Sequence, residues 1–283
     1  MTEDKPSDLF FENHELKLHC LDWGSDRSRP LLLLHGPRDC ARGWDIFAQA
    51  MRPDHHVVAL DSRGHGDSGW AAEGHYTFAD HVADVGAAVD HLGFSDMVLV
   101  GHSMGGRYAW TYAAEHPTRV SALVVLDIDP DPMNLQMQRD FDAYRAEPAE
   151  WDSIDAVVDR LRQRQTYTSE EVLQHQANHL TRQLSDGKLV WKSDPRVMDE
   201  YEWPDLWDSW RRISCPTLIL RGRQSTILTH ETAVRMREAL PGSRVRLAEL
   251  DGGGHWFYQD FPGAFHSTVR WFLEGLVDQR ATP

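Results

Sequence analysis

Cysteine is scarce in this sequence, whose 283 residues contain three, at Cys20, Cys40 and Cys215. Their number is odd and they stand far apart, so the sequence predicts neither a disulfide framework nor a cysteine metal site. No apolar run approaches the roughly 18 residues of a membrane span, and residues 1–8 have no apolar core of a signal peptide. These absences predict a cytoplasmic protein with no membrane partner.

Positive charge is also in short supply, with 29 Lys and Arg against 44 Asp and Glu and a formal net charge of -15. The acidic residues are spread along the chain, which argues against a polyanionic partner such as nucleic acid. An acidic small molecule stays compatible with this charge, because a local pair of arginines can outweigh it. We expect a small-molecule substrate and a monomer or homodimer.

Short apolar segments alternate with helix-like segments along most of the chain. Strands are predicted at residues 16–23, 30–35, 57–61, 97–100, 122–127, 217–221 and 245–250, and helices at 77–92, 106–116, 230–240 and 262–277. This alternation is typical of an α/β fold with a mostly parallel sheet covered by helices on both faces. In such sheets, ligands bind at the carboxyl ends of the strands.

Residues 130–212 interrupt the alternation. They are polar, rich in Arg, Gln and Trp, and show a helical pattern without a clear strand signal. We interpret them as a helical insertion between the strand ending at Asp127 and the strand starting at Thr217. The predicted organisation is a core domain of residues 1–129 and 213–283, with the insertion above the carboxyl ends of its strands.

The strongest motif lies at residues 97–106, which read Met-Val-Leu-Val-Gly-His-Ser-Met-Gly-Gly. A G-x-S-x-G pattern between a strand and a helix is typical of a nucleophilic serine on a tight turn. Gly101 and Gly105 lack the β-carbons that would clash in such a turn. We therefore predict that Ser103 is a nucleophile above a helix N-terminus; the alternative is an ordinary Gly-Ser turn.

Three more motifs accompany this serine: His35-Gly36 after a buried strand, D-x-R-G-x-G-x-S at residues 61–68, and Gly-Gly-His-Trp at residues 253–256. Together the four motifs resemble the α/β-hydrolase superfamily over nearly the whole chain. The chain is similar to bacterial cap-bearing hydrolases of esters, lactones and amides, including enol-lactonase and acetamidomethylene-succinate hydrolase types. The resemblance implies an α/β-hydrolase fold, a cap domain at residues 130–212, and catalytic residues in the order serine, acid, histidine.

His255 is the predicted base for Ser103, because a serine hydroxyl needs a base within hydrogen-bond reach. It follows the last predicted strand in a glycine-rich loop that can approach the serine closely. Many members of the family carry the acid after the strand that ends here at Arg221. The turn at residues 222–228 contains no Asp or Glu, however, and Ser225 or Thr226 occupies the expected position.

Asp127 is the predicted acid. A subset of the family places its acid at the end of the preceding strand in an aspartate–x–x–proline pattern, and Asp127 matches it 24 residues after Ser103. Asp129 and Asp251 are the alternatives. Asp251 precedes the histidine loop, where it is more consistent with shaping the turn.

The oxyanion hole departs from the family pattern. The backbone N–H of Met104, next to the nucleophile, is one expected donor. The family takes its second donor from the residue after His-Gly, but here that residue is Pro37, which has no N–H. Three possibilities follow: Arg38 supplies the donor after a loop rearrangement, a side chain takes the role, or the hole has one arm.

Two residues are candidates for substrate binding, Trp256 beside the base and Arg164 in the insertion. The resemblance implies that Arg164 lies near cap arginines that hold a substrate carboxylate. A solvated helical face is the alternative explanation for the cluster at Arg160, Arg162 and Arg164. Among the insertion's tryptophans we expect one or two at most to contact substrate, and we interpret Arg63 and His65 as structural.

The sequence therefore predicts a serine hydrolase of a small ester, lactone or amide that uses no cofactor and no metal. Pro37 keeps a second class open: carbon–carbon bond hydrolases, perhydrolases and non-hydrolytic lyases or cyclases share this fold. A small-molecule receptor with a weak triad is a third possibility. A panel of substrates and a covalent serine probe separate the three.

Overall fold

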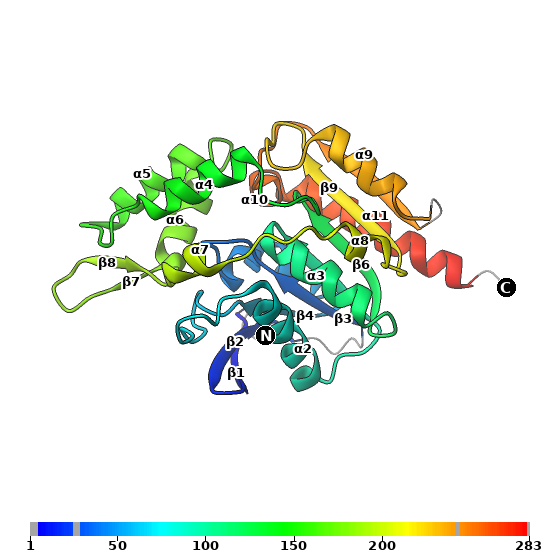
Figure 1. Ribbon diagram of the computed structural model, residues 1–283, viewed down its shortest axis with the longest axis horizontal. Helices are drawn as coiled ribbons and strands as arrows, with labels where there is room; N and C mark the ends of the chain where they lie inside the picture. The colour runs from blue at the N-terminus through cyan, green and yellow to red at the C-terminus, as the bar shows by residue number, and fades with distance from the viewer. Residues whose placement is uncertain (1–4, 25–28, 242–243, 282–283) are drawn as a thin grey trace.

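A computed structural model of the chain describes residues 5–24, 29–241 and 244–281. An eight-stranded sheet runs through its centre in the order β1-β2-β4-β3-β5-β6-β9-β10 (Figure 1). Its strands are β1 (Ser7–Asn13), β2 (Leu16–Asp22), β3 (Pro30–Leu34), β4 (His56–Asp61), β5 (Met97–His102), β6 (Val120–Leu126), β9 (Thr217–Gly222) and β10 (Val245–Leu250). The six strands from β4 to β10 in this order are parallel, and β1 and β2 are antiparallel to their neighbours.

The mostly parallel sheet confirms the predicted fold class, but β1 was not predicted. Its burial alternates weakly, with Phe11 buried and Phe10 exposed, because it is an edge strand that pairs with β2 alone. Edge strands carry a weaker pattern than strands buried on both faces. The first four and last two residues of the predicted core domain lie outside the described residues.

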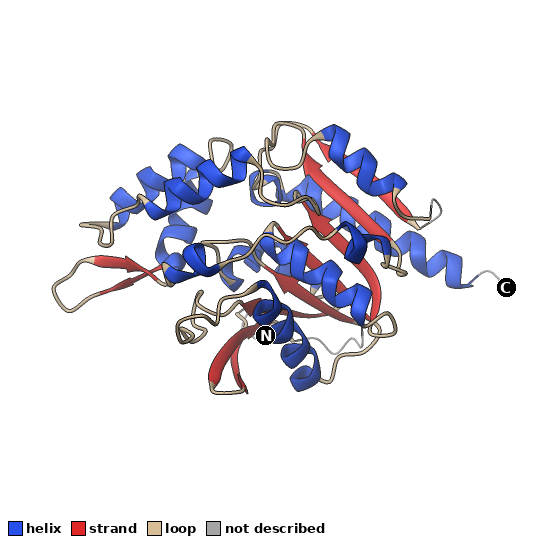
Figure 2. Cartoon of the chain, viewed as in Figure 1, coloured by secondary structure: helices blue, strands red, loops and turns tan. Residues whose placement is uncertain are grey.

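Successive residues of the central strands point to opposite faces, and each face has its own apolar core. Leu32 and Leu34 join the core on the side of α2 (Phe78–Leu92), α3 (Met104–Glu115) and α9 (His230–Glu238). Leu31 and Leu33 join the core on the side of α1 (Asp45–Met51), α10 (Phe257–Asp260) and α11 (Pro262–Ala281). Helices on both faces of a parallel sheet explain why these strands read as continuous apolar runs (Figure 2).

We call the segment between β6 and β9 the cap. Its last helix, α8 (Trp207–Arg211), packs against α3 of the core. The cap also contains α4 (Leu135–Arg145), α5 (Ile154–Arg164), α6 (Glu170–Leu180) and α7 (Arg196–Glu200). Figure 1 shows α4, α5 and α6 grouped at the left of the view. Within the cap, Val157, Leu161, Leu173 and Trp191 belong to a small apolar cluster of their own.

The insertion is mostly helical, as predicted, but it also includes a hairpin of β7 (Thr181–Gln183) and β8 (Leu189–Trp191) that was not predicted. Each strand has three residues, too few for an alternating pattern to stand out in the sequence. Among the described residues, no helix is long and apolar enough to cross a membrane. The three cysteines are buried and free.

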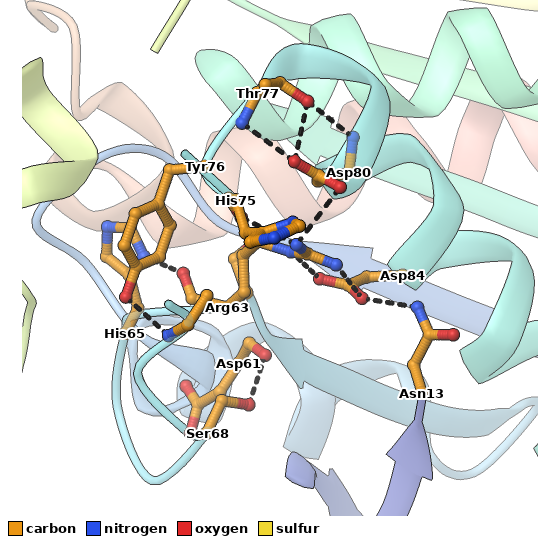
Figure 3. Close-up of polar contacts among 12 residues, drawn as sticks. Asn13, Asp61, Arg63, His65, Ser68, His75, Tyr76, Thr77, Asp80 and Asp84 are labelled. Atoms are coloured by element: carbon orange, nitrogen blue, oxygen red, sulfur yellow. Dashed lines mark hydrogen bonds and ion pairs between the residues drawn. The ribbon is translucent and has the colours of Figure 1, made fainter. Parts of the chain in front are cut away.

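A buried ion pair between Arg63 and Asp84 holds the loop after β4 in place. The guanidinium of Arg63 donates from Nε and Nη2 to the two carboxylate oxygens of Asp84 in α2, at 2.6 and 2.7 Å, and from Nη1 to the carbonyl of His75 at 2.7 Å (Figure 3). His65 is buried in the same loop, and burial lowers its pKa to about 3. These contacts agree with a structural role for both residues.

Truncating one member of this pair should be costly. Arg63→Ala leaves the Asp84 carboxylate buried without its charged partner, although Asn13 still donates to it at 2.8 Å. We expect the free energy of unfolding to fall by about 3–5 kcal/mol in urea denaturation. The double variant Arg63→Met/Asp84→Leu should recover part of the loss. The control Arg211→Ala, which breaks an exposed pair with Asp208, should cost about 1 kcal/mol or less. Equal losses in Arg63→Ala and Arg211→Ala contradict the expectation.

Candidate active site

Ser103 lies on the sharp turn between β5 and α3, with φ 53° and ψ -125°. A positive φ is strained for a residue with a side chain, and such strain is common at functional sites. A β-carbon on Gly101 would lie 2.3 Å from the carbonyl oxygen of Gly105, and one on Gly105 would lie 2.5 Å from that of Leu34. The predicted reason for both glycines is thus confirmed.

His255 and Asp127 meet although 128 residues separate them. Nδ1 of His255 donates to Oδ2 of Asp127 at 2.7 Å. Asp127 directly follows β6 and is fully buried, and His255 lies in the loop between β10 and α10. Burial raises the pKa of Asp127, and the hydrogen bonds from His255 and Ser225 oppose that rise.

The two alternative acids lie elsewhere. Asp129 is buried and accepts a hydrogen bond from the backbone N–H of Asp131 at 3.1 Å, and burial raises its pKa to about 7. Asp251 is exposed and accepts from the side-chain amide of Gln224 and its neighbour's backbone N–H, both at 3.1 Å. Of the three candidates, Asp127 is the one whose carboxylate contacts His255.

Ser225 makes a contact with Asp127 that was not predicted. Its hydroxyl donates to Oδ2 of Asp127 and accepts from the backbone N–H of Ile227 at 3.1 Å. Ser225 lies in the turn after β9, where the resemblance led us to expect an acid, and it reaches across to the carboxylate that follows the neighbouring strand β6. A small hydroxyl residue in a turn that lacks an acid was the available signal for this contact.

His102, the residue before the nucleophile, also has an unpredicted contact. Its Nε2 donates to the backbone carbonyl of His255 at 2.9 Å, and its ring lies 4.5 Å from the His255 ring and 4.7 Å from that of Tyr258. Burial lowers the pKa of His102 well below its ordinary value, so its imidazole is neutral. It joins the nucleophile turn to the histidine loop.

The three residues considered for the oxyanion hole, Met104, Pro37 and Arg38, differ in where they lie. Met104 is the first residue of α3, so its N–H belongs to the turn of the helix that has no partner within the helix. Pro37 forms part of the cavity wall around Ser103. Arg38 has a positive φ of 56°, and its side chain lies against the cap, donating to the carbonyl of Tyr144 at 3.2 Å.

The cavity at Ser103 is small, about 30 Å³. Its wall comprises Pro37, Ser103, Ile128, Met137, Asp140, Phe141, Tyr144, Arg164, Trp203, Ile227, His255 and Trp256. A second cavity of about 330 Å³ shares Asp140, Arg164, Ile227, His255 and Trp256 with it. The larger cavity is thus the outer part of the site, and residues of α4 form much of the inner wall.

Both predicted substrate-binding residues face this cavity. The guanidinium of Arg164 lies 3.6 Å from the centre of the Tyr144 ring and 5.4 Å from that of Trp256. Glu147, which is buried, lies among three guanidinium groups: Arg160 at 2.8 Å, Arg38 at 3.5 Å and Arg164 at 3.7 Å. The wall of the cavity at Ser103 itself contains one arginine, Arg164, and one aspartate, Asp140.

Most of the cap tryptophans pack against other side chains, and one of them lines the cavity at Ser103. Trp203 faces the cavity at Ser103, while Trp151 and Trp191 pack edge to face within the cap. Trp210 is fully buried against Trp110 of the core, and Trp207 donates its ring N–H to Asp131 at 2.6 Å. One cap tryptophan is therefore available to substrate.

Comparison with known proteins identifies the family of the chain. A family model described as alpha/beta hydrolase fold matches residues 29–262. Esterase Rv0045c of Mycobacterium tuberculosis is 28% identical over 269 residues, covering 93% of this chain and 87% of that protein. A putative 2-succinyl-6-hydroxy-2,4-cyclohexadiene-1-carboxylate synthase of Bacillus subtilis is 26% identical over 263 residues, covering 90% and 94%.

Solved structures show the same fold. The crystal structure of E-2-(acetamidomethylene)succinate hydrolase superposes with a TM-score of 0.84 at 20% identity, covering 95% of this chain and 99% of that one. An α/β hydrolase from Novosphingobium aromaticivorans superposes with a TM-score of 0.85 at 24% identity, covering 96% and 99%. The resemblance predicted from the four motifs is confirmed.

Proposed function

The chain belongs to the α/β-hydrolase family, and we propose that this enzyme is a serine hydrolase whose triad is Ser103, His255 and Asp127. The observation that carries the proposal is the 2.7 Å hydrogen bond between Asp127 and His255, with His255 and Ser103 in the wall of one cavity. The proposed substrate is a small ester, lactone or amide.

In the proposed mechanism, Nε2 of His255 takes the proton of the Ser103 hydroxyl as the oxygen attacks the carbonyl carbon. The tetrahedral intermediate places its negative charge at the N-terminus of α3, where the Met104 N–H donates to it. His255 then gives its proton to the departing alcohol or amine. Water, deprotonated by His255, hydrolyses the acyl group from Ser103.

Asp127 holds the imidazole by accepting from Nδ1, which leaves Nε2 as the basic nitrogen. Its negative charge stabilises the imidazolium that forms during the attack. Ser225 contributes a hydrogen bond to the same carboxylate and so favours its ionised form within a buried site.

Arg164 gives the substrate a second point of attachment. Its guanidinium lines both cavities and is stacked on Tyr144, an arrangement that fixes the orientation of its donors. Arginine binds carboxylates through paired, charge-assisted hydrogen bonds. We therefore propose a substrate that carries a carboxylate, with Trp256 and Trp203 forming apolar wall around the scissile group.

A second candidate function is a non-hydrolytic reaction on a carboxylate substrate. Pro37 cannot supply the family's second oxyanion donor, and one relative is named as a putative synthase of a cyclohexadiene carboxylate. In this alternative His255 and Ser103 move protons, and no acyl group is formed on the serine.

A fluorophosphonate probe tests the nucleophile. We expect one equivalent to attach to the wild-type protein at Ser103, because the probe reacts with activated serines, and Ser103→Ala to abolish labelling measured by mass spectrometry. Ser121→Ala, which removes a buried hydroxyl on β6 that bonds to backbone carbonyls, should label normally. Labelling of Ser103→Ala contradicts the proposal. An acyl adduct trapped with a chromogenic ester distinguishes hydrolysis from the second candidate.

Substitution of Asp127 should lower kcat more than substitution of Ser225. Asp127→Asn is expected to lower kcat by about 10⁴-fold, because the imidazole loses its orienting charge. Ser225→Ala removes one hydrogen bond to a charged group, worth about 1.5–3 kcal/mol, and should lower kcat about tenfold to a hundredfold. The measurement is kcat for hydrolysis of a chromogenic ester by both variants, with Ser121→Ala as the control. Near-normal turnover of Asp127→Asn would assign the acid to Asp129 or Asp251.

Arg164 should control recognition of the substrate's charge. We expect Arg164→Gln to raise KM for a half ester of a dicarboxylic acid about tenfold or more, because a charge-assisted hydrogen bond is lost. KM for the matched neutral diester should change little. Arg162→Gln, at an exposed arginine on the same helix paired with Asp159 and Glu170, is the control. Equal changes for the charged and neutral esters refute carboxylate recognition.

A further inference from the structure

A second cluster of side chains with ligand chemistry lies where the cap meets the core. His175 and His179 are four residues apart on α6, so they share one face of the helix. This helix packs against η1 (Ala41–Trp44), and Asp45 directly follows as the first residue of α1. These three side chains do not line the cavity at Ser103.

The three side chains are close enough to share one small ion. One ligand atom from each lies within 4.8 Å of the others, and the two imidazole rings are 4.5 Å apart between centres. In a tetrahedral zinc site with bonds of about 2.0–2.1 Å, ligand atoms are about 3.4 Å apart. Side-chain rotations that move the ligand atoms by about 1 Å therefore bring these atoms to the spacing of a zinc site.

The carboxylate of Asp45 is poorly satisfied by the protein. Its Oδ1 is buried and has no hydrogen-bond partner. Its Oδ2 lies 3.3 Å from Nε2 of His175 and 3.4 Å from Nη1 of Arg42, which is long beside the roughly 2.7–2.9 Å of charge-assisted hydrogen bonds. A buried charged oxygen without a partner is costly, and a cation is the group that would satisfy it.

We propose that Asp45, His175 and His179 form a binding site for a divalent transition-metal ion such as Zn²⁺. Two imidazole nitrogens and one carboxylate oxygen are a donor set that such ions accept, with water completing the coordination. The His175 side chain is 38% exposed, which gives the ion access from solvent. Arg42 must turn away from Asp45 as the ion enters.

Metal binding here joins two parts of the molecule. His175 and His179 belong to the cap and Asp45 to the core, so the ion fixes α6 to α1. The site does not depend on the chemistry proposed for Ser103, and its test needs no substrate.

Another group of possible ligands, His19, Asp61 and Asp67, is less suited to an ion. Both ring nitrogens of His19 are already within hydrogen-bond distance of carboxylates, at 2.7 Å from Asp61 and 3.0 Å from Asp8. Asp67 pairs with Lys192 at 2.7 Å. The side chains of this group already have hydrogen-bond or ion-pair partners, whereas Oδ1 of Asp45 is buried and has no hydrogen-bond partner.

Calorimetric titration of chelator-treated protein with ZnCl₂ tests the proposal. We expect the wild type to bind one ion, and Asp45→Asn and the double variant His175→Gln/His179→Gln to bind at least about tenfold more weakly. Arg42→Ala should bind more tightly, because a competing cation is removed from Asp45. His230→Gln, at an exposed histidine beside Glu249, should match the wild type.

Two further measurements make the result decisive. Co²⁺ in the wild type should give the d–d absorption of a low-coordinate nitrogen and oxygen site, and the double variant should lose it. Zn²⁺ should raise Tm of the wild type more than that of the double variant. Absence of Zn²⁺ binding by the wild type, or wild-type affinity in the double variant, overturns the proposal. So does binding that Asp67→Asn alone removes, which would place the ion at the other group.

Discussion

A fully buried carboxylate, Asp127, holds His255 through a 2.7 Å hydrogen bond, and the geometry of the site depends on this contact. His255 and Ser225 both donate to Oδ2 of this carboxylate, while its Oδ1 is buried without a hydrogen-bond partner. The contact unites the ends of three adjacent strands: β6 carries Asp127, β9 leads to Ser225, and β10 leads to the histidine loop. Because the strands are parallel, their carboxyl ends lie at the same edge of the sheet.

The turn after β9, where the resemblance led us to expect an acid, lies next to the carboxylate that contacts His255 after β6. β6 and β9 are neighbours, so a carboxylate after either strand can approach the same imidazole. Ser225, in the turn after β9, donates its hydroxyl to the Asp127 carboxylate. The cap supplies the other half of the site, with α4 and α5 bringing Tyr144 and Arg164 over Ser103.

Most of the fold was predictable because its central strands are buried on both faces and its turns contain distinctive glycines. The edge strand β1 and the hairpin β7–β8 were missed, since an exposed edge and three-residue strands carry little periodicity. Ser225 and His102 were not recognised as contacts of Asp127 and His255, because each makes its contact with a residue far away in the chain. Glu147 and its three arginines were likewise hidden, as Arg38 comes from the core and the others from the cap.

The sequence by itself determined the elbow at Ser103, because the steric requirement of that turn is local and the two glycines meet it within five residues. It also determined the parallel sheet through its apolar runs, and it favoured Asp127 as the acid over Asp129, Asp251 or another acid. The tertiary structure decided that Asp127 is the carboxylate beside His255, that Arg38 turns toward the cap, and that Arg164 faces the cavity. These outcomes depend on distances between segments far apart in the chain, which the packing of cap on core sets and no local pattern encodes.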